Sequence, residues 1–384
     1  MIEVYVGEKP PAQFSKSIFL AGPTPRSASV SSWRPEALSL LASLGYDGVV
    51  FIPETRAGGL GTYYPDQVEW EETHLNMSDV IVFWIPRNME TLPGLTTNNE
   101  WGRLEESGRV VLGTPAQAEH VRYQRYYAQK RFVPTADTLI DTLKHALAQI
   151  GDGALREGGQ RDVPLFVWRT TSFQQWHNAH TAVGNRLDGA VVKWVFRVGP
   201  QKKFMFMWIM HVNIHIASEN RNKVNEFVIA RPDISTIIMY RRRPDILDSE
   251  ILLVREFRSP VSNETGFVWE APGGSSIKGG TDPKILAAEE CHEETGITVD
   301  PSRIVIHEAR QLAATLSAHK SHVFSIELTD EQMVAARADH GNPHGLIADS
   351  EMTFTEVRTL REILNGTYVD WSMIGMIASV LQGK

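Results

Sequence analysis

The chain of 384 residues contains one cysteine, Cys291, and no long apolar run. A single cysteine excludes an intramolecular disulfide, which fits a reducing cytoplasm. The most apolar stretch, residues 204–210, is far too short to cross a bilayer, and the alternation over residues 212–216 predicts a buried strand. Residues 1–16 lack the apolar core of a secretory signal. We therefore expect a cytoplasmic protein with no membrane partner.

Basic residues are also in short supply. The chain has 38 Lys and Arg against 46 Asp and Glu, a formal net charge of −8. Proteins that bind nucleic acid through phosphate need clustered Lys and Arg, and no basic recognition helix is evident, so we expect no nucleic-acid partner. The length exceeds what one ordinary core accommodates and predicts two domains.

Residues 1–150 alternate strand-like and helix-like patterns, which is typical of a parallel sheet covered by helices. Near-continuous apolar strands such as residues 79–85 indicate cover on both faces. The prediction is an α/β domain with a doubly wound, Rossmann- or flavodoxin-like sheet. Its strands are expected at 17–21, 48–52, 79–85 and 109–112, and its helices at 33–44, 99–107 and 136–150.

Residues 151–162 are polar, Gly-rich and unpatterned, which predicts a linker. From residue 163 to 384 longer alternating strands enclose a helix, an α+β layout. We expect the extra strands between residues 163 and 231 to help build a pocket or a dimer interface. The protein is therefore expected to form a homo-oligomer, a dimer or higher.

Three carboxylates share one face of the helix predicted after Pro283, because Glu290, Glu293 and Glu294 are spaced i, i+3 and i+4. Like charges stacked in this way weaken a free helix. A hard cation such as Mg²⁺ or Mn²⁺ would remove that penalty, and its open positions could bind diphosphate oxygens. The alternative is an ordinary solvated acidic face.

Residues 290–297 resemble the second half of the Nudix hydrolase signature, while the first half departs from it at Ser275, Thr281 and Glu289. The resemblance implies an α+β Nudix sandwich and bound Mg²⁺ (or Mn²⁺). It implies Glu290, Glu293 and Glu294 as metal ligands, with Glu294 also catalytic. Which substrate the altered loop accepts stays open.

Two further segments, residues 252–258 and 269–274, are similar to ADP-ribose pyrophosphatase-type Nudix enzymes. By that resemblance Arg258 and Glu270 would contact substrate or metal. The alternative for Arg258 is an ordinary surface residue of a strand. The segment containing Glu351 resembles the loop that often supplies the catalytic base, with Asp349 as the second candidate. A base must reach the attacking water, so Glu351 is expected near the metal.

In the N-terminal region one acidic residue, Glu100, is predicted in the first turn of a helix that follows an apolar strand. Gly22 and Pro23 end another strand, at the edge where open parallel sheets bind ligands. A helix N-terminus keeps a carboxylate ionised, so Glu100 could act on a ribose C1′ as nucleophile or stabiliser. The alternative is ordinary capping chemistry.

Residues 15–148 resemble the nucleoside 2-deoxyribosyltransferase-like family in the strand-Gly-Pro opening, the acidic segment before a Ser-Asp strand and the Glu-x-Gly helix start. The resemblance implies Glu100 as nucleophile. It implies substrate contacts from Gly22, Pro23, Glu71, Asn98 and Asn99. Ile18 and Gly94 stand where those transferases have an aromatic hydroxyl and an Asp. Hydrolysis or simple binding of an N-glycosidic bond therefore stands beside transfer.

Together these features predict a two-domain hydrolase of nucleotide metabolism. The C-terminal domain would cleave a nucleoside diphosphate linked to another group, an ADP-ribose-like compound. The N-terminal domain would cleave or bind the N-glycosidic bond of a nucleoside or nucleotide. The alternative from another class is a nucleotide-sensing protein in which one or both domains are catalytically silent.

Overall fold

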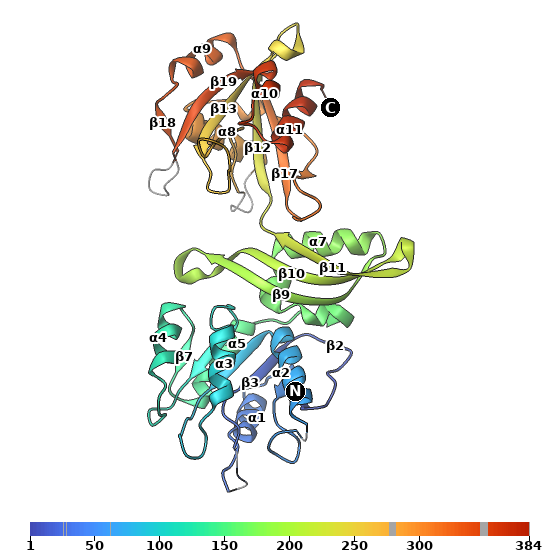
Figure 1. Ribbon diagram of the computed structural model, residues 1–384, viewed down its shortest axis with the longest axis vertical. Helices are drawn as coiled ribbons and strands as arrows, with labels where there is room; N and C mark the ends of the chain where they lie inside the picture. The colour runs from blue at the N-terminus through green and yellow to red at the C-terminus, as the bar shows by residue number, and fades with distance from the viewer. Residues whose placement is uncertain (26, 28, 62, 276–281, 346–351, 384) are drawn as a thin grey trace. The chain divides into compact units, whose positions relative to one another are not determined.

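The computed structural model describes residues 1–25, 27, 29–61, 63–275, 282–345 and 352–383 (Figure 1). Its contacts divide the chain into two compact units, Met1–Ala230 and Arg231–Lys384. The boundary inferred from the sequence, at residue 163, lies inside the first of these units. Residues 163–230 therefore belong to the same compact unit as the residues that precede them.

The first unit contains a six-stranded sheet in the order β1-β4-β3-β5-β6-β7, and every neighbouring pair is parallel. This confirms the predicted parallel α/β architecture. The strands are β1 (Ile2–Tyr5), β3 (Ser17–Ala21), β4 (Val49–Ile52), β5 (Val80–Trp84), β6 (Val110–Gly113) and β7 (Thr135–Ala136).

Helices cover both faces of this sheet. Alternate residues of each strand therefore enter two separate cores, one on each face. On one face Phe19 and Phe83 pack with Trp70 and Trp101 from the covering helices. On the other face Leu20 and its neighbours pack with residues of two further helices. The first layer is α2 (Tyr64–Met77), α3 (Leu95–Leu104) and α4 (Arg122–Lys130); the second is α1 (Arg34–Ser43) and α5 (Leu139–Ile150) (Figure 1).

The strand order creates a switch point beside β3. The chain crosses from β3 to β4 on one side, and β5 then pairs with the other side of β3. In open parallel sheets, loops that leave such a point in opposite directions form a crevice at the carboxyl ends of the strands. The segments after Ala21, Ile52 and Trp84 therefore meet at the edge where a ligand is expected.

Residues 151–162 are part of the packed structure, so the predicted linker is wrong. They form β8 (Arg156–Glu157), which pairs with β2 (Gln13–Phe14), and the 3-10 helix η1 (Gly158–Asp162). The polar composition of this segment predicted an exposed linker, but Arg156 is fully buried, in an ion pair of 2.6 Å with Asp79. A buried pair of this kind has no apolar pattern to reveal it.

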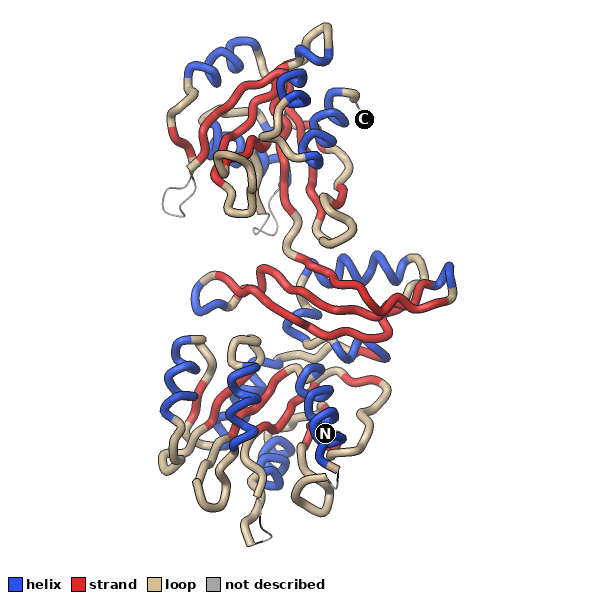
Figure 2. The backbone as a smooth tube through the Cα atoms, viewed as in Figure 1, coloured by secondary structure: helices blue, strands red, loops and turns tan. Residues whose placement is uncertain are grey.

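A three-stranded antiparallel sheet completes the first unit (Figure 2). It consists of β9 (Arg186–Val198), β10 (Phe204–Ile216) and β11 (Arg221–Ala230), preceded by α6 (Leu165–Trp168) and α7 (Thr171–Ala182). Phe173 and Trp176 of α7 pack on Trp208 of β10. The buried strand predicted over residues 204–216 is confirmed on this face, where Trp208 is inaccessible to solvent.

The second unit is a mixed sheet between two helix layers. Its central order is β15-β17-β12-β13-β19-β18, in which only the β12–β17 pair is parallel, while β14 and β16 pair with β13 and β17. The strands are β12 (Ile234–Arg241), β13 (Glu250–Phe257), β14 (Phe267–Glu270), β15 (Val305–Ile306), β16 (Arg310–Gln311), β17 (Lys320–Glu327), β18 (Pro343–His344) and β19 (Thr353–Thr359).

The helices α8 (Pro283–Thr295) and α9 (Asp330–Ala338) share a core with one face of this sheet, and α10 (Leu360–Asn365) and α11 (Trp371–Leu381) share one with the other. Layers alone do not identify a family, so the Nudix assignment of this unit stays a prediction. Within the described ranges, no helix has the length and apolarity needed to span a membrane.

Candidate functional site

The loop after β3 is held tightly at the carboxyl edge of the parallel sheet. Gly22 has a φ of 151°, and a Cβ added there would collide with the carbonyl oxygen of Trp84 and lie 2.9 Å from the Trp33 ring. Pro23 lies close to the start of α3, since a Cβ added to Gly94 would be 3.0 Å from Pro23 Cγ. The two residues predicted from the strand-Gly-Pro pattern therefore do sit at the switch point.

Two carboxyl groups from different helices interact electrostatically with Arg34, whose guanidinium donates a hydrogen bond to the Gly22 carbonyl at this edge. Glu71 lies on α2, and Gln67 donates a hydrogen bond of 2.6 Å to its Oε1. Glu100 lies on α3, and its electrostatic partners are Glu71, Arg34 and Arg103. The fold thus brings together Glu71 and Glu100, which are 29 positions apart in the sequence.

The expectation that a helix N-terminus keeps Glu100 ionised is wrong. Helix α3 begins at Leu95, after Gly94 in the left-handed conformation, so Glu100 is the sixth helical residue and lies beyond the first turn. Burial, and then the charge of Glu71, raise the pKa of Glu100 to about 7, against the opposing effects of Arg34 and Arg103. Burial likewise raises the pKa of Glu71. With a pKa of about 7, Glu100 is present in both its protonated and its ionised form near neutral pH.

The asparagines predicted beside Glu100 are not gathered with it. Asn98 and Glu100 are two residues apart on α3, so their side chains leave the helix about 200° apart. Asn98 Oδ1 accepts hydrogen bonds from Arg87, at 2.5 Å, and from Gln124, at 2.7 Å. Its amide thus supports the packing of the loop after β5, and Asn99 is exposed.

Sequence reasoning missed the buried ion pair at this edge. Arg34 of α1 donates to Glu54 Oε1 at 2.5 Å, and both side chains are almost completely buried. Glu54 follows β4 and also accepts a hydrogen bond of 2.9 Å from Ser32. The available signal was a charged residue at a position whose helical neighbours Ala37, Leu38 and Leu41 are all buried.

In the second unit, two of the three predicted metal ligands lie against the loop that follows β14. The Gly273 N–H donates to Glu294 Oε2 at 3.2 Å. The Glu290 carboxylate is in contact with Gly274, where an added Cβ would collide with it. Glu293 is exposed on the same helix, as is Glu289. Within the described ranges, no group of three or more His, Cys, Asp or Glu side chains is gathered closely enough to hold a metal ion.

The predicted substrate contacts of this unit are joined to each other. Arg258 forms ion pairs of 2.9 Å with Glu270 of β14 and with Glu256 of β13. Ser275 accepts a hydrogen bond from Arg231, which is not part of any of the motifs predicted from the sequence. Thr281, Asp349 and Glu351 lie outside the described residues, so the general-base assignment stays a prediction.

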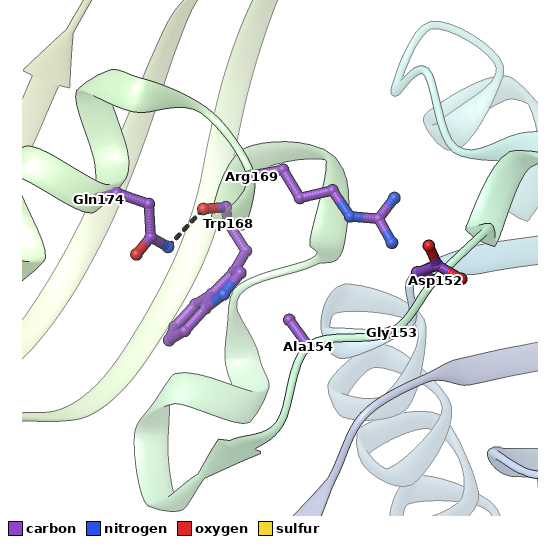
Figure 3. A pocket seen from close by; sticks show the side chains of 6 residues that line it. All are labelled: Asp152, Gly153, Ala154, Trp168, Arg169 and Gln174. Carbon is purple, nitrogen blue, oxygen red and sulfur yellow. Dashed lines mark hydrogen bonds between the residues drawn. The ribbon is translucent and has the colours of Figure 1, made fainter.

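A separate cavity of about 500 Å³ opens in the first unit (Figure 3). It is lined by Asp152, Gly153, Ala154, Trp168, Arg169 and Gln174. Gln174 donates to the Trp168 carbonyl at 2.6 Å, and Arg169 donates to the Ile150 carbonyl at 2.7 Å. None of the predicted site residues lines this cavity, and the side chains of Arg169 and Gln174 are engaged in holding the backbone around it.

Comparison with known families supports the N-terminal assignment. A family model described as nucleoside 2-deoxyribosyltransferase like matches residues 15–118. The chain thus has an N-terminal nucleoside 2-deoxyribosyltransferase-like domain, which suggests an enzyme and fits nucleoside or nucleotide processing. The match covers the switch point, Glu71 and Glu100 and does not reach the second unit. No curated protein matches the chain.

Proposed function

We propose that the N-terminal domain cleaves the N-glycosidic bond of a nucleoside or nucleotide, with Glu100 as the carboxylate that faces the ribose C1′. The observation that carries the proposal is that Glu71 and Glu100 interact with each other and with Arg34, which holds the Gly22 loop, inside the region that matches the family. Glycosidic bonds are usually cleaved near neutral pH by a pair of carboxyl groups, of which one is ionised and the other keeps its proton.

Each carboxyl group has a separate task in this reaction. The ionised Glu100 oxygen attacks C1′, or stabilises the positive charge that develops there, while the C1′–N bond breaks and its electron pair goes to the base. Glu71, whose pKa burial also raises, would supply the proton that the leaving base takes up in those molecules in which Glu71 carries the proton and Glu100 is ionised. Water then attacks C1′, the bond between C1′ and Glu100 breaks, and the proton of the water goes to Glu71, which completes hydrolysis. A second base in place of water would complete transfer.

Release of free base from nucleosides and nucleoside 5′-monophosphates, followed by chromatography, tests this proposal. We expect Glu100→Gln to lower kcat at least 100-fold, in the range found for positioned acid–base groups. The matched control is Glu69→Gln, because Glu69 lies on the same helix as Glu71 and is exposed. Loss of activity in both variants, or retention in Glu100→Gln, would contradict the role of Glu100.

We propose as a second activity that the C-terminal unit is a Nudix hydrolase that cleaves a nucleoside diphosphate linked to another group, such as an ADP-ribose-like compound. The observation that favours it is the contact of Glu290 and Glu294 with the Gly273–Gly274 loop. This contact places two acidic side chains of α8 beside backbone that a diphosphate could approach closely.

The donor chemistry of this helix fits Mg²⁺ or Mn²⁺, because both cations prefer carboxylate oxygens. Glu290, Glu293 and Glu294 would hold the ion, which when bound would polarise the diphosphate and lower the pKa of the attacking water. Arg258 would then neutralise phosphate charge, and it would exchange part of its pairing with Glu270 for the substrate.

Release of AMP from ADP-ribose with Mg²⁺ tests the second activity. Glu294→Gln should abolish it, while Glu100→Gln in the other unit should leave it unchanged. Glu289→Gln is the matched control, since Glu289 is exposed on the same helix. Tight nucleotide binding without any product, with every metal tried, would instead favour a nucleotide sensor.

A further inference from the structure

Arg34 is a charged side chain in a core position. It is 1% exposed on α1 and packs beside the Trp33 ring, with its guanidinium carbon 4.8 Å from the ring centroid. Burying an ion pair is expensive, and replacing such a pair by apolar residues is often neutral or stabilising for the fold. Stability alone is therefore a weak explanation for Arg34 and its partner Glu54.

The hydrogen bonds of Arg34 all lead to the edge where the ligand is expected. Its Nε donates to the Leu20 carbonyl at 3.1 Å, and its Nη2 donates to the Gly22 carbonyl at 2.9 Å. Its Nη1 donates to Thr24 Oγ1 at 3.1 Å and to Glu54 at 2.5 Å. One planar group thus fixes the end of β3, the loop after it and the segment after β4.

The charge of Arg34 also acts on the two carboxyl groups of the proposed site. Burial lowers the pKa of the guanidinium, and the charges of Glu54, Glu100 and Glu71 oppose that effect. In return Arg34 lowers the pKa values of both Glu71 and Glu100. Besides Glu71, which raises the pKa of Glu100, the other charged group acting on Glu100 is the cation Arg103 of its own helix. Arg34 is thus the buried cation among three carboxylates from three different segments.

We propose that Arg34 is a positioning residue for N-glycosidic cleavage: it fixes the Gly22 loop and supplies the counter-charge that lets the Glu71–Glu100 pair carry a negative charge. This inference rests on the proposed function of the N-terminal domain. Arg34 has no assigned contact with the reacting atoms, and it acts through the loop and through the two carboxyl groups.

Variants on the two sides of the ion pair separate this role from a structural one. Glu54→Gln removes the pair but keeps the cation, so the pKa of Glu100 should stay the same or fall. The double variant Arg34→Met with Glu54→Gln also removes the pair but leaves no unpaired buried charge, so it should fold. In it the pKa of Glu100 should rise by about one unit or more.

The measurement is a ¹³C NMR titration of the full chain labelled at glutamate, with the Glu100 signal assigned by its loss in Glu100→Gln. In the double variant, the low-pH side of the pH–rate profile for base release should move to higher pH by the same amount. Equal shifts of the Glu100 pKa in both variants, or no shift in either, would overturn the proposal. Because the titration needs no substrate, it tests Arg34 even if no base is released, and a lack of base release counts against the proposed function alone.

Discussion

Gly22 and Trp84 approach so closely that the first has no room for a side chain: a Cβ on Gly22 would collide with the Trp84 carbonyl oxygen. This contact joins the ends of β3 and β5, the two strands on either side of the switch point. The crevice at the sheet edge therefore depends on a glycine for steric reasons as well as for its φ of 151°.

Gly22→Ala should destabilise the protein by roughly 3 kcal/mol, because overpacking and a strained φ act together. Urea unfolding measures the change. Gly102→Ala is the matched control, since Gly102 lies in α3 with open space around it. In a helix that substitution should stabilise by about 0.5–1 kcal/mol. Similar effects of the two substitutions would show that the close approach at Gly22 is unimportant.

The raised pKa of Glu100 makes stability depend on pH. The folded carboxyl group, with a pKa of about 7, binds its proton more tightly than an unfolded one at about 4.5. Its contribution to stability is therefore fully present below pH 4.5 and is lost as the pH rises through 7. We expect the free energy of unfolding to fall between pH 5 and pH 8 in the natural protein, and to fall less in Glu100→Gln. A pH dependence that Glu100→Gln leaves intact would mean that other groups dominate.

The buried ion pair of Asp79 and Arg156 should be sensitive to loss of one partner. Asp79 accepts two hydrogen bonds from Arg156, of 2.6 and 2.8 Å, and one of 2.8 Å from the Leu165 N–H. Arg156→Met leaves the carboxylate buried and should cost about 3–5 kcal/mol in thermal or urea unfolding. Removing both charges, in Arg156→Met with Asp79→Asn, should cost less than Arg156→Met alone. A larger loss in the double variant would contradict this.

Cys291 offers a probe of the second unit. It is inaccessible to solvent in α8, and burial, followed by the charges of Glu294 and Glu290, raises its pKa to about 12. Because the thiolate is the reactive form, a thiol reagent at pH 8 should modify the folded protein slowly and the urea-unfolded protein quickly. Rapid modification without urea would show that α8 opens away from its sheet.

The regular elements of the first unit were accessible from sequence, since their signal is local. The strand predicted over residues 17–21 is β3 (Ser17–Ala21), because five apolar or small residues in a row have both faces covered. The start of α3 was misplaced by four residues. The polar Thr96–Asn99 segment suggested a turn, whereas Gly94 in the left-handed conformation begins the helix at Leu95.

The supporting contacts of the site could not be predicted, because they join residues without periodic spacing. No local sequence pattern links Arg34 to Glu54, or Asp79 to Arg156. These residues meet only when the strands pair in the folded sheet. Glu71 and Glu100 were found through family resemblance, but their protonation depends on burial that only the fold defines. The same limit applies to Arg258, whose pairing with Glu270 comes from the register of β13 and β14.

The segment that carries the family similarity and the segment that folds are of different lengths. The match ends at residue 118, and the parallel sheet and its helices end at Ile150. A polypeptide cut there would keep Asp79 and lose Arg156, together with the strand that pairs with β2. A fragment meant to contain the whole first unit should therefore extend to Ala230, where the contacts divide, because one that ends at Ile150 leaves Asp79 without its partner Arg156.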